Sequence, residues 1–213
     1  MIDARRRMVR HQLAARDIHD GRVLEAMERV PRELFVPDYL RGRAYDDAAL
    51  PIGKGQTISQ PAMVALICEL LALRGDERVL DVGTGSGYQA AVLAELAAEV
   101  HTVERISELA DRARESIEAA GYGERVHVHV GDGTLGDPAH APFAAIAVAA
   151  AAPGVPSALY EQLEPEGRLV LPVGSKHDQL LERVVRSTDG PRTKRSVPCR
   201  FVPLVGREGF ARG

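Results

Sequence analysis

A glycine-rich turn between an apolar run and the start of a helix is the feature that most constrains the fold of this chain. Residues 78–88 read Arg-Val-Leu-Asp-Val-Gly-Thr-Gly-Ser-Gly-Tyr, with Gly83, Gly85 and Gly87 at every second position. The apolar run is typical of a buried parallel strand, and glycines let the backbone turn tightly and approach a ligand that a Cβ atom would repel. We therefore expect a strand, a tight turn and a helix that begins at a ligand site.

An acidic residue follows this turn at the spacing of a ribose ligand. Glu104 closes the next apolar run, about 20 residues after the turn, where a carboxylate accepts both hydroxyls of a ribose. The pattern is not the Gly-x-Gly-x-x-Gly of dinucleotide-binding proteins, because Tyr88 stands in place of the third glycine. A pyrophosphate requires bare amides at a helix N-terminus, whereas S-adenosylmethionine carries a sulfonium cation that Asp81 at the strand end would suit. The motif favours S-adenosylmethionine over NAD, and its alternative is a plain βα turn.

Composition limits the class of protein. The 213 residues are 45% hydrophobic and 27% charged with a formal net charge of −3, which indicates a globular chain and gives no sign of a nucleic-acid or membrane partner. The basic run 5–7 precedes no long apolar stretch, so we expect neither a signal peptide nor a transmembrane span. Cys68 and Cys199 lie far apart, which predicts free thiols in a reducing compartment. We expect a cytoplasmic monomer.

Alternating strand and helix patterns predict an α/β fold with a doubly wound, mostly parallel sheet. Residues 1–60 should form an N-terminal helical cap and a loop at 49–61, and residues 61–213 the α/β core of the same single domain. Strands are predicted at 79–82, 100–104, 126–130, 145–150 and 168–173, with helices at 3–16, 20–30, 88–98 and 107–120. Two last strands, 180–186 and 197–205, flank an Asp-Gly turn and should be antiparallel.

Several segments together resemble one known family. The loop at 49–61, Ala-Leu-Pro-Ile-Gly-Lys-Gly-Gln-Thr-Ile-Ser-Gln-Pro, is the most specific of them. The others are 79–89, 103–106, 131–133, 167–174 and 200–204. They resemble the protein-L-isoaspartate (D-aspartate) O-methyltransferases, a repair branch of the Rossmann-like class I methyltransferases. One departure is Ala144, where the family usually has Asp; this position is predicted to open a strand rather than to touch reacting groups.

The resemblance implies an activity. Such an enzyme uses S-adenosylmethionine to methylate the free carboxylate of L-isoaspartyl and D-aspartyl residues in damaged proteins and peptides. The ester closes spontaneously to a succinimide, whose hydrolysis returns a fraction of normal aspartate. Methyl transfer from a sulfonium to a carboxylate joins opposite charges into neutral products, so a site that excludes water favours it without a general base. The protein must then supply alignment.

Ser59 is expected to position the substrate carboxylate through its hydroxyl, although a Ser before a helical apolar run is also a good N-cap. By resemblance, Asp132 would accept the adenine amino group, although an Asx-turn residue is an equal interpretation. Thr57 and Gln60 are expected at the methionine end of the cofactor. The full expected cofactor set is Thr57, Gln60, Asp81, Gly83, Thr84, Gly85, Gly87, Glu104, Asp132 and Gly133. Substrate contacts are expected from Pro51, Ile52, Val202, Pro203 and Leu204.

The sequence also raises a possible metal site and two alternative functions. His127 and His129 lie at i and i+2, on one face of a strand, but the sequence shows no third ligand at suitable spacing, so no metal is expected. One alternative function is methylation of an Asp in a dedicated peptide substrate. The other is a catalytically silent cofactor-binding module, which the intact Ser59 and Glu104 argue against.

Overall fold

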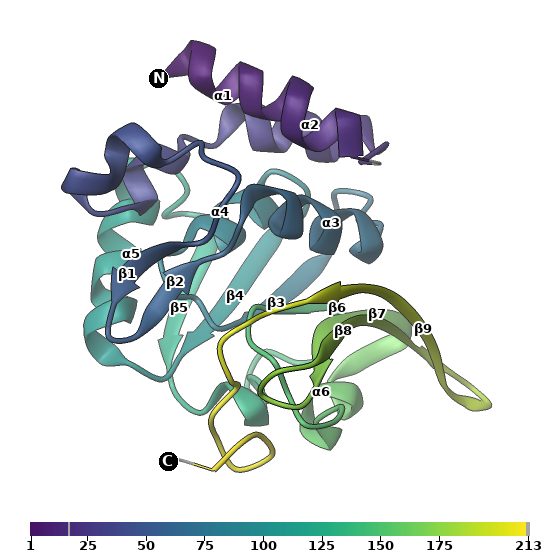
Figure 1. Cartoon of the computed structure of the whole chain (residues 1–213). Coiled ribbons are helices and arrows are strands. Elements are labelled where there is room, and N and C mark those ends of the chain that lie inside the picture. Colours follow the sequence, from purple (N-terminus) through teal and green to yellow (C-terminus); the bar gives the residue numbers. More distant parts are fainter. Residues whose placement is uncertain (17, 212–213) are drawn as a thin grey trace.

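A seven-stranded sheet forms the centre of the computed structural model, which describes residues 1–16 and 18–211 (Figure 1). Its strands lie in the order β5-β4-β3-β6-β7-β8-β9. The bounds are β3 Arg78–Val82, β4 Glu99–Glu104, β5 Val126–Val130, β6 Phe143–Val148, β7 Leu163–Gly174, β8 Gln179–Ser187 and β9 Gly190–Cys199. The first five strands in this order pair in parallel, and β7-β8 and β8-β9 pair antiparallel. The predicted mostly parallel α/β sheet with antiparallel C-terminal strands is confirmed.

Alternation along the strands gives the sheet two apolar faces. Val79 and Val100 pack with the helices α3 (Pro61–Leu71), α4 (Tyr88–Ala94) and α5 (Ser107–Ala119). Leu80 and Val103 point to the opposite face and pack with the short helix α6 (Ser157–Glu161). Because successive side chains of a strand point to opposite sides, a residue's parity decides which of these two layers it enters. The same rule decides where Asp81 and His101 lie.

The N-terminal cap lies over α3 and α4 (Figure 1). The helix predicted at 3–16 is divided into α1 (Ile2–Met8), a π-helical turn (Val9–Leu13) and a 3₁₀ turn (Ala14–Arg16). The next helix, α2 (Gly21–Arg29), starts with the side chain of Asp20 accepting the N–H of Arg22. Two 3₁₀ segments, Arg32–Phe35 and Asp38–Arg43, lead to the loop that the sequence singled out.

That loop contains a β-hairpin, β1 (Leu50–Gly53) and β2 (Gln56–Ile58). Lys54 and Gly55 connect the two strands with φ angles of 53° and 71°, which is the positive pair that a type I′ hairpin turn requires. The prediction of a simple loop was therefore incomplete. The Gly-Lys-Gly sequence carried the turn signal, but strands this short have too few residues to show an alternation.

The final strand was predicted at the wrong place. β9 begins directly after the turn, at Gly190, and ends at Cys199, whereas 197–205 was expected. β9 is the edge strand and exposes its residues 191–198, so it carries no apolar alternation to read. The apolar stretch that suggested a strand instead makes isolated bridges, Ala151 with Pro203 and Val205 with Phe210.

Within the described residues, none of the helices has the length and apolarity to cross a membrane. Both cysteines are free; Cys68 is buried in the core as predicted, and Cys199 is half-buried.

Candidate active site

A pocket opens at the carboxyl ends of β3 and β4, where open parallel sheets bind ligands. It encloses about 760 Å³, including the space at its mouth. Most of its wall comes from four separate parts of the chain: residues 56–59 around β2, the turn after β3, residues 103–106 at the end of β4, and residues 202–205 near the C-terminus.

The glycine turn takes the shape that its sequence predicted. Gly83, Gly85 and Gly87 have φ angles of 93°, 54° and 89°, a region that glycine adopts without steric cost. Gly83 and Gly85 line the pocket together with Thr84. Gly87 lies behind the wall, where an added Cβ would come within 2.9 Å of Ile117. Its role is to let α4 start close against α5 rather than to contact a ligand.

Glu104 is buried at the tip of β4 and lies on the pocket wall. Its two carboxylate oxygens accept the backbone N–H groups of Gly85 and Ile106, each at 2.9 Å. A carboxylate oxygen has a second lone pair, so each can still accept a ligand hydroxyl. Glu104 therefore fixes the glycine turn and presents a rigid acceptor to the pocket.

Asp81 does not line the pocket, and its predicted direct contact with the cofactor is corrected here. The side chain is fully buried, and its oxygens accept Thr102 Oγ1 at 2.7 Å and Gln89 Nε2 at 2.8 Å. Strand parity is the reason, because residue 81 points under α4 rather than past the strand end. Burial raises the pKa of Asp81 to about 6. Asp81 therefore positions the side chain of Gln89. Through Thr102 it also positions Thr84, whose hydroxyl oxygen lies 2.6 Å from the hydroxyl oxygen of Thr102.

Gln89 is a site residue that the sequence reasoning missed. It lines the pocket from the first turn of α4, and its Oε1 is buried without a protein hydrogen-bond partner. Buried polar atoms are almost always hydrogen-bonded, so this acceptor is suited to an N–H donor of a ligand. The available signal was its position, two residues after the last glycine of the turn.

Thr57 and Ser59 line the same pocket, as predicted. The N-cap of α3 is Gln60, and no side chain makes a capping hydrogen bond there. The capping interpretation of Ser59 is therefore wrong, and its hydroxyl is left for another role. Gln60 does not line this pocket, and its Nε2 donates to Asp47 Oδ1.

A second cleft adjoins the pocket at Ser59. It is bordered by residues 198–202 and by Gln60 and Met63, and it shares Thr57, Ser59, Ala149 and Val202 with the first pocket. The predicted wall of Val202, Pro203 and Leu204 lines the first pocket. A ligand in one cavity would thus meet a ligand in the other beside Ser59.

Pro51, Ile52 and Asp132 also lie outside the lining of the first pocket. Pro51 is exposed on β1, and Ile52 is buried against Gly85, so neither lies on the wall of either cavity. Asp132 caps a 3₁₀ turn (Gly133–Leu135) through the Thr134 N–H at 3.0 Å, and it accepts the Arg207 N–H at 2.8 Å. Asp132 thus forms the Asx turn, and its adenine contact stays a prediction, while its neighbour Gly133 lines the pocket.

Arg32 holds the loop at residues 49–61 in place through the loop's backbone. Its guanidinium is completely buried, donates to the carbonyl oxygens of Ala44 and Ser59 at 2.8 Å each, and lies 4.7 Å from the ring centroid of Tyr88. Burial lowers the pKa of Arg32, opposed by the neighbouring tyrosine. A lone Arg after a proline gave no sequence signal for this role.

Comparison with known proteins decides the family. Residues 4–209 match the model of the Protein-L-isoaspartate(D-aspartate) O-methyltransferase (PCMT) family. The chain belongs to this family.

Relatives within the PCMT family cover nearly the whole chain. Protein-L-isoaspartate O-methyltransferase 2 of Marinobacter nauticus is 58% identical over 99% of this chain and 96% of its own length. The Methanopyrus kandleri protein-L-isoaspartate O-methyltransferase is 53% identical over 97% of this chain and 93% of its own.

Solved structures of PCMT proteins share the fold. One protein-L-isoaspartate O-methyltransferase superposes with a TM-score of 0.87 at 28% identity, over 96% of this chain and 67% of that one. A Plasmodium falciparum PCMT in complex with S-adenosyl-L-homocysteine has a TM-score of 0.82 at 24% identity, over 94% of this chain and 98% of its own. The predicted class I methyltransferase fold is confirmed.

Proposed function

We propose that this protein transfers the methyl group of S-adenosylmethionine to the free carboxylate of L-isoaspartyl and D-aspartyl residues in damaged proteins and peptides. The observation that carries the proposal is the junction at Ser59, where a pocket with the features of a nucleoside site meets a second cleft open to a peptide. Family membership supports the same assignment.

The pocket residues fit S-adenosylmethionine. Glu104 on the pocket wall would accept the ribose hydroxyls, and the absence of Cβ atoms at Gly83 and Gly85 lets a ligand approach the backbone. The unpartnered Oε1 of Gln89 suits the amino group of the methionine part. When bound, this cofactor supplies an electrophilic methyl group on a positively charged sulfur.

The residues around the junction do the work that methyl transfer requires. Ser59 would donate its hydroxyl hydrogen to one carboxylate oxygen of the substrate and leave the other oxygen free to react. Val202 and Leu204 form an apolar wall that displaces water, which favours the loss of opposite charges during the reaction. Within the described residues, no histidine lines the pocket, in accordance with a mechanism that moves no proton.

Paired peptides test the proposal. One peptide carries an isoaspartyl residue and its twin a normal Asp at the same position, and both are incubated with the protein and a labelled methyl donor. We expect label in the isoaspartyl peptide alone. Label in the Asp twin would favour modification of a dedicated peptide, and label in neither would favour a catalytically silent module.

We also infer that the protein works in the cytoplasm as a monomer, without a nucleic-acid or membrane partner. The near-neutral charge balance and the two free thiols support this inference. Size-exclusion chromatography with light scattering tests the oligomeric state, and a dimer mass at micromolar protein would contradict it.

A further inference from the structure

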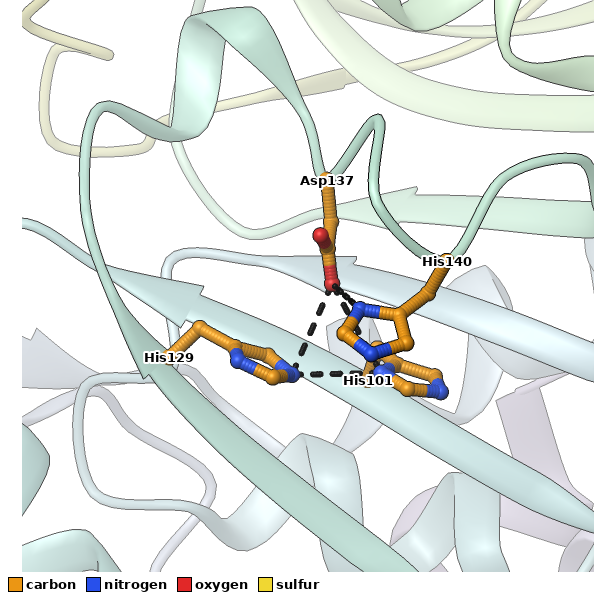
Figure 2. A group of neighbouring side chains, drawn as sticks. All are labelled: His101, His129, Asp137 and His140. Atoms are coloured by element: carbon orange, nitrogen blue, oxygen red, sulfur yellow. Dashed lines mark hydrogen bonds and ion pairs between the residues drawn. The ribbon is translucent and has the colours of Figure 1, made fainter.

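Four metal-ligating side chains converge on the face of the sheet opposite α4 (Figure 2). His101 comes from β4 and His129 from β5, while Asp137 and His140 come from the loop after the 3₁₀ turn. One ligand atom from each residue can be chosen so that all lie within 4.8 Å of one another. The sequence showed no third ligand for His129, because this group is assembled from three segments that only the fold brings together.

We propose that His101, His129, Asp137 and His140 bind one divalent transition-metal ion of the Zn²⁺ class. This His101 cluster offers three imidazoles and one carboxylate, the ligand types that Zn²⁺ binds in proteins. The assignment does not depend on methyl transfer, because none of the four residues lines the cofactor pocket or the adjoining cleft.

The distances within the cluster suit a tetrahedral ion. Zn²⁺ bonds nitrogen and oxygen at about 2.0–2.1 Å, so two of its ligand atoms lie about 3.4 Å apart. His101 Nδ1 is 3.1 Å from His129 Nε2, and Asp137 Oδ2 is 3.6 Å and 3.5 Å from these two nitrogens. His140 Nδ1 is 2.8 Å from Asp137 Oδ2. Three of these four distances thus have the spacing of ligands on one ion. The fourth, between His140 and Asp137, is shorter, and a small side-chain rotation would lengthen it to the same spacing.

The surroundings of His101 are those of a metal ligand. This side chain is buried, and its Nε2 makes no hydrogen bond, although it points at Glu99 Oε1 at 3.3 Å. Metal-bound histidines commonly direct their second nitrogen at a carboxylate, which fixes the ring and its tautomer.

The imidazole rings of the cluster pack closely around Asp137. The rings of His101 and His140 stack with centroids 4.2 Å apart, and those of His101 and His129 lie 5.4 Å apart. Asp137 Oδ2 lies within 3.6 Å of a nitrogen of each of the three rings. One divalent ion among them would contact all four side chains.

The site would be structural. Four protein ligands fill a tetrahedron and leave no open position for catalysis. The 3₁₀ turn before the loop that supplies Asp137 and His140 starts at Gly133, on the wall of the cofactor pocket. An ion would therefore tie this loop to β4 and β5, and its effect should appear in stability rather than in the chemistry.

Zn²⁺ titration of protein prepared without a histidine tag and treated with a chelator tests the proposal. We expect one ion per chain by calorimetry, and tetrahedral d–d absorption bands when Co²⁺ is substituted. At free Zn²⁺ about 100 times the dissociation constant, the apparent folding constant should rise about 100-fold, seen as a higher melting temperature.

Variants locate the ion. His129→Ala and Asp137→Asn should weaken Zn²⁺ binding by more than about 100-fold and abolish the thermal shift, since even outer-sphere partners account for about 10–100-fold. His127→Ala is the matched control, because it lies on the same face of β5 and outside the cluster. Absence of one-to-one binding in the wild type would overturn the proposal, as would equal binding by all three variants. The Co²⁺ bands of the wild type decide the case even where a variant folds poorly.

Discussion

Arg32 donates a 2.8 Å hydrogen bond from its buried guanidinium to the backbone carbonyl of Ser59. Ser59, which is proposed to hold the substrate carboxylate, is therefore held at its backbone by Arg32, a side chain that lines neither cavity. Ser59 does not cap a helix, and this contact holds its backbone in place at the start of α3.

Replacing Arg32 should slow methyl transfer more than it weakens cofactor binding. In Arg32→Lys, a single ammonium replaces the two separate guanidinium nitrogens that donate to the Ala44 and Ser59 carbonyls, and an acceptor left unsatisfied costs about 1–3 kcal/mol. We expect lower stability in urea and a lower kcat, with the affinity for S-adenosylhomocysteine nearly unchanged. Arg41→Ala, an exposed change in the same cap, is the control. A normal kcat under conditions where Arg32→Lys is folded would contradict the positioning role.

Loss of Glu104 should weaken cofactor binding. Glu104→Ala removes the proposed ribose acceptor and also frees the Gly85 and Ile106 N–H groups. Hydrogen bonds to charged groups contribute about 1.5–3 kcal/mol, so affinity should fall at least about 10-fold. Calorimetric titration with S-adenosylhomocysteine measures this, with exposed Glu108→Ala as the control. Unchanged affinity would remove the ribose assignment.

Asp81 should make stability depend on pH in an unusual direction. Its folded pKa of about 6 lies above the ordinary 3.8, so the native state holds the proton more tightly and loses stability as pH rises through this window. Asp81→Asn keeps an acceptor for Gln89 and carries no charge. The free energy of unfolding of this variant, relative to that of the wild type, should therefore rise by about 2–3 kcal/mol as the pH increases from about 4 to about 7. Urea unfolding of both proteins at these pH values tests the direction of this change. A stability difference between them that does not depend on pH would refute the prediction.

Ser59→Ala separates catalysis from folding. The hydroxyl is assigned to the substrate carboxylate, so the variant should bind cofactor normally, melt at nearly the wild-type temperature and transfer methyl groups more slowly. Ser86→Ala, also on the pocket wall, is the matched control. A variant that loses about 1 kcal/mol of stability but keeps its rate would show that Ser59 is structural after all.

The glycine turn and Glu104 were predictable because their functions depend on local backbone shape and on spacing along two adjacent strands. Asp81 was not, since the parity of a strand residue has no meaning until the helix covering that face is known. Ile52 was misplaced for a similar reason: in the β1-β2 hairpin it packs against Gly85 and lines neither the first pocket nor the adjoining cleft.

Contacts between distant segments left no trace in the sequence. Arg32 reaches Ser59 across 27 positions, and nothing in its local pattern distinguishes it from a surface arginine. His101 and Asp137 meet because β4, β5 and the following loop pack together. A pair of histidines at i and i+2 was visible, but its third and fourth partners depend on tertiary structure.

Single-turnover methyl transfer with excess enzyme tests the central claim most directly, because neither product release nor succinimide closure can hide the step. Labelled methyl should pass to an isoaspartyl peptide and not to its Asp twin. The rate should be nearly flat between about pH 6 and about pH 8, since the substrate carboxylate is already ionised there. Equal labelling of both peptides, no labelling of either, or a steep titration in this range that points to a histidine base would contradict the account.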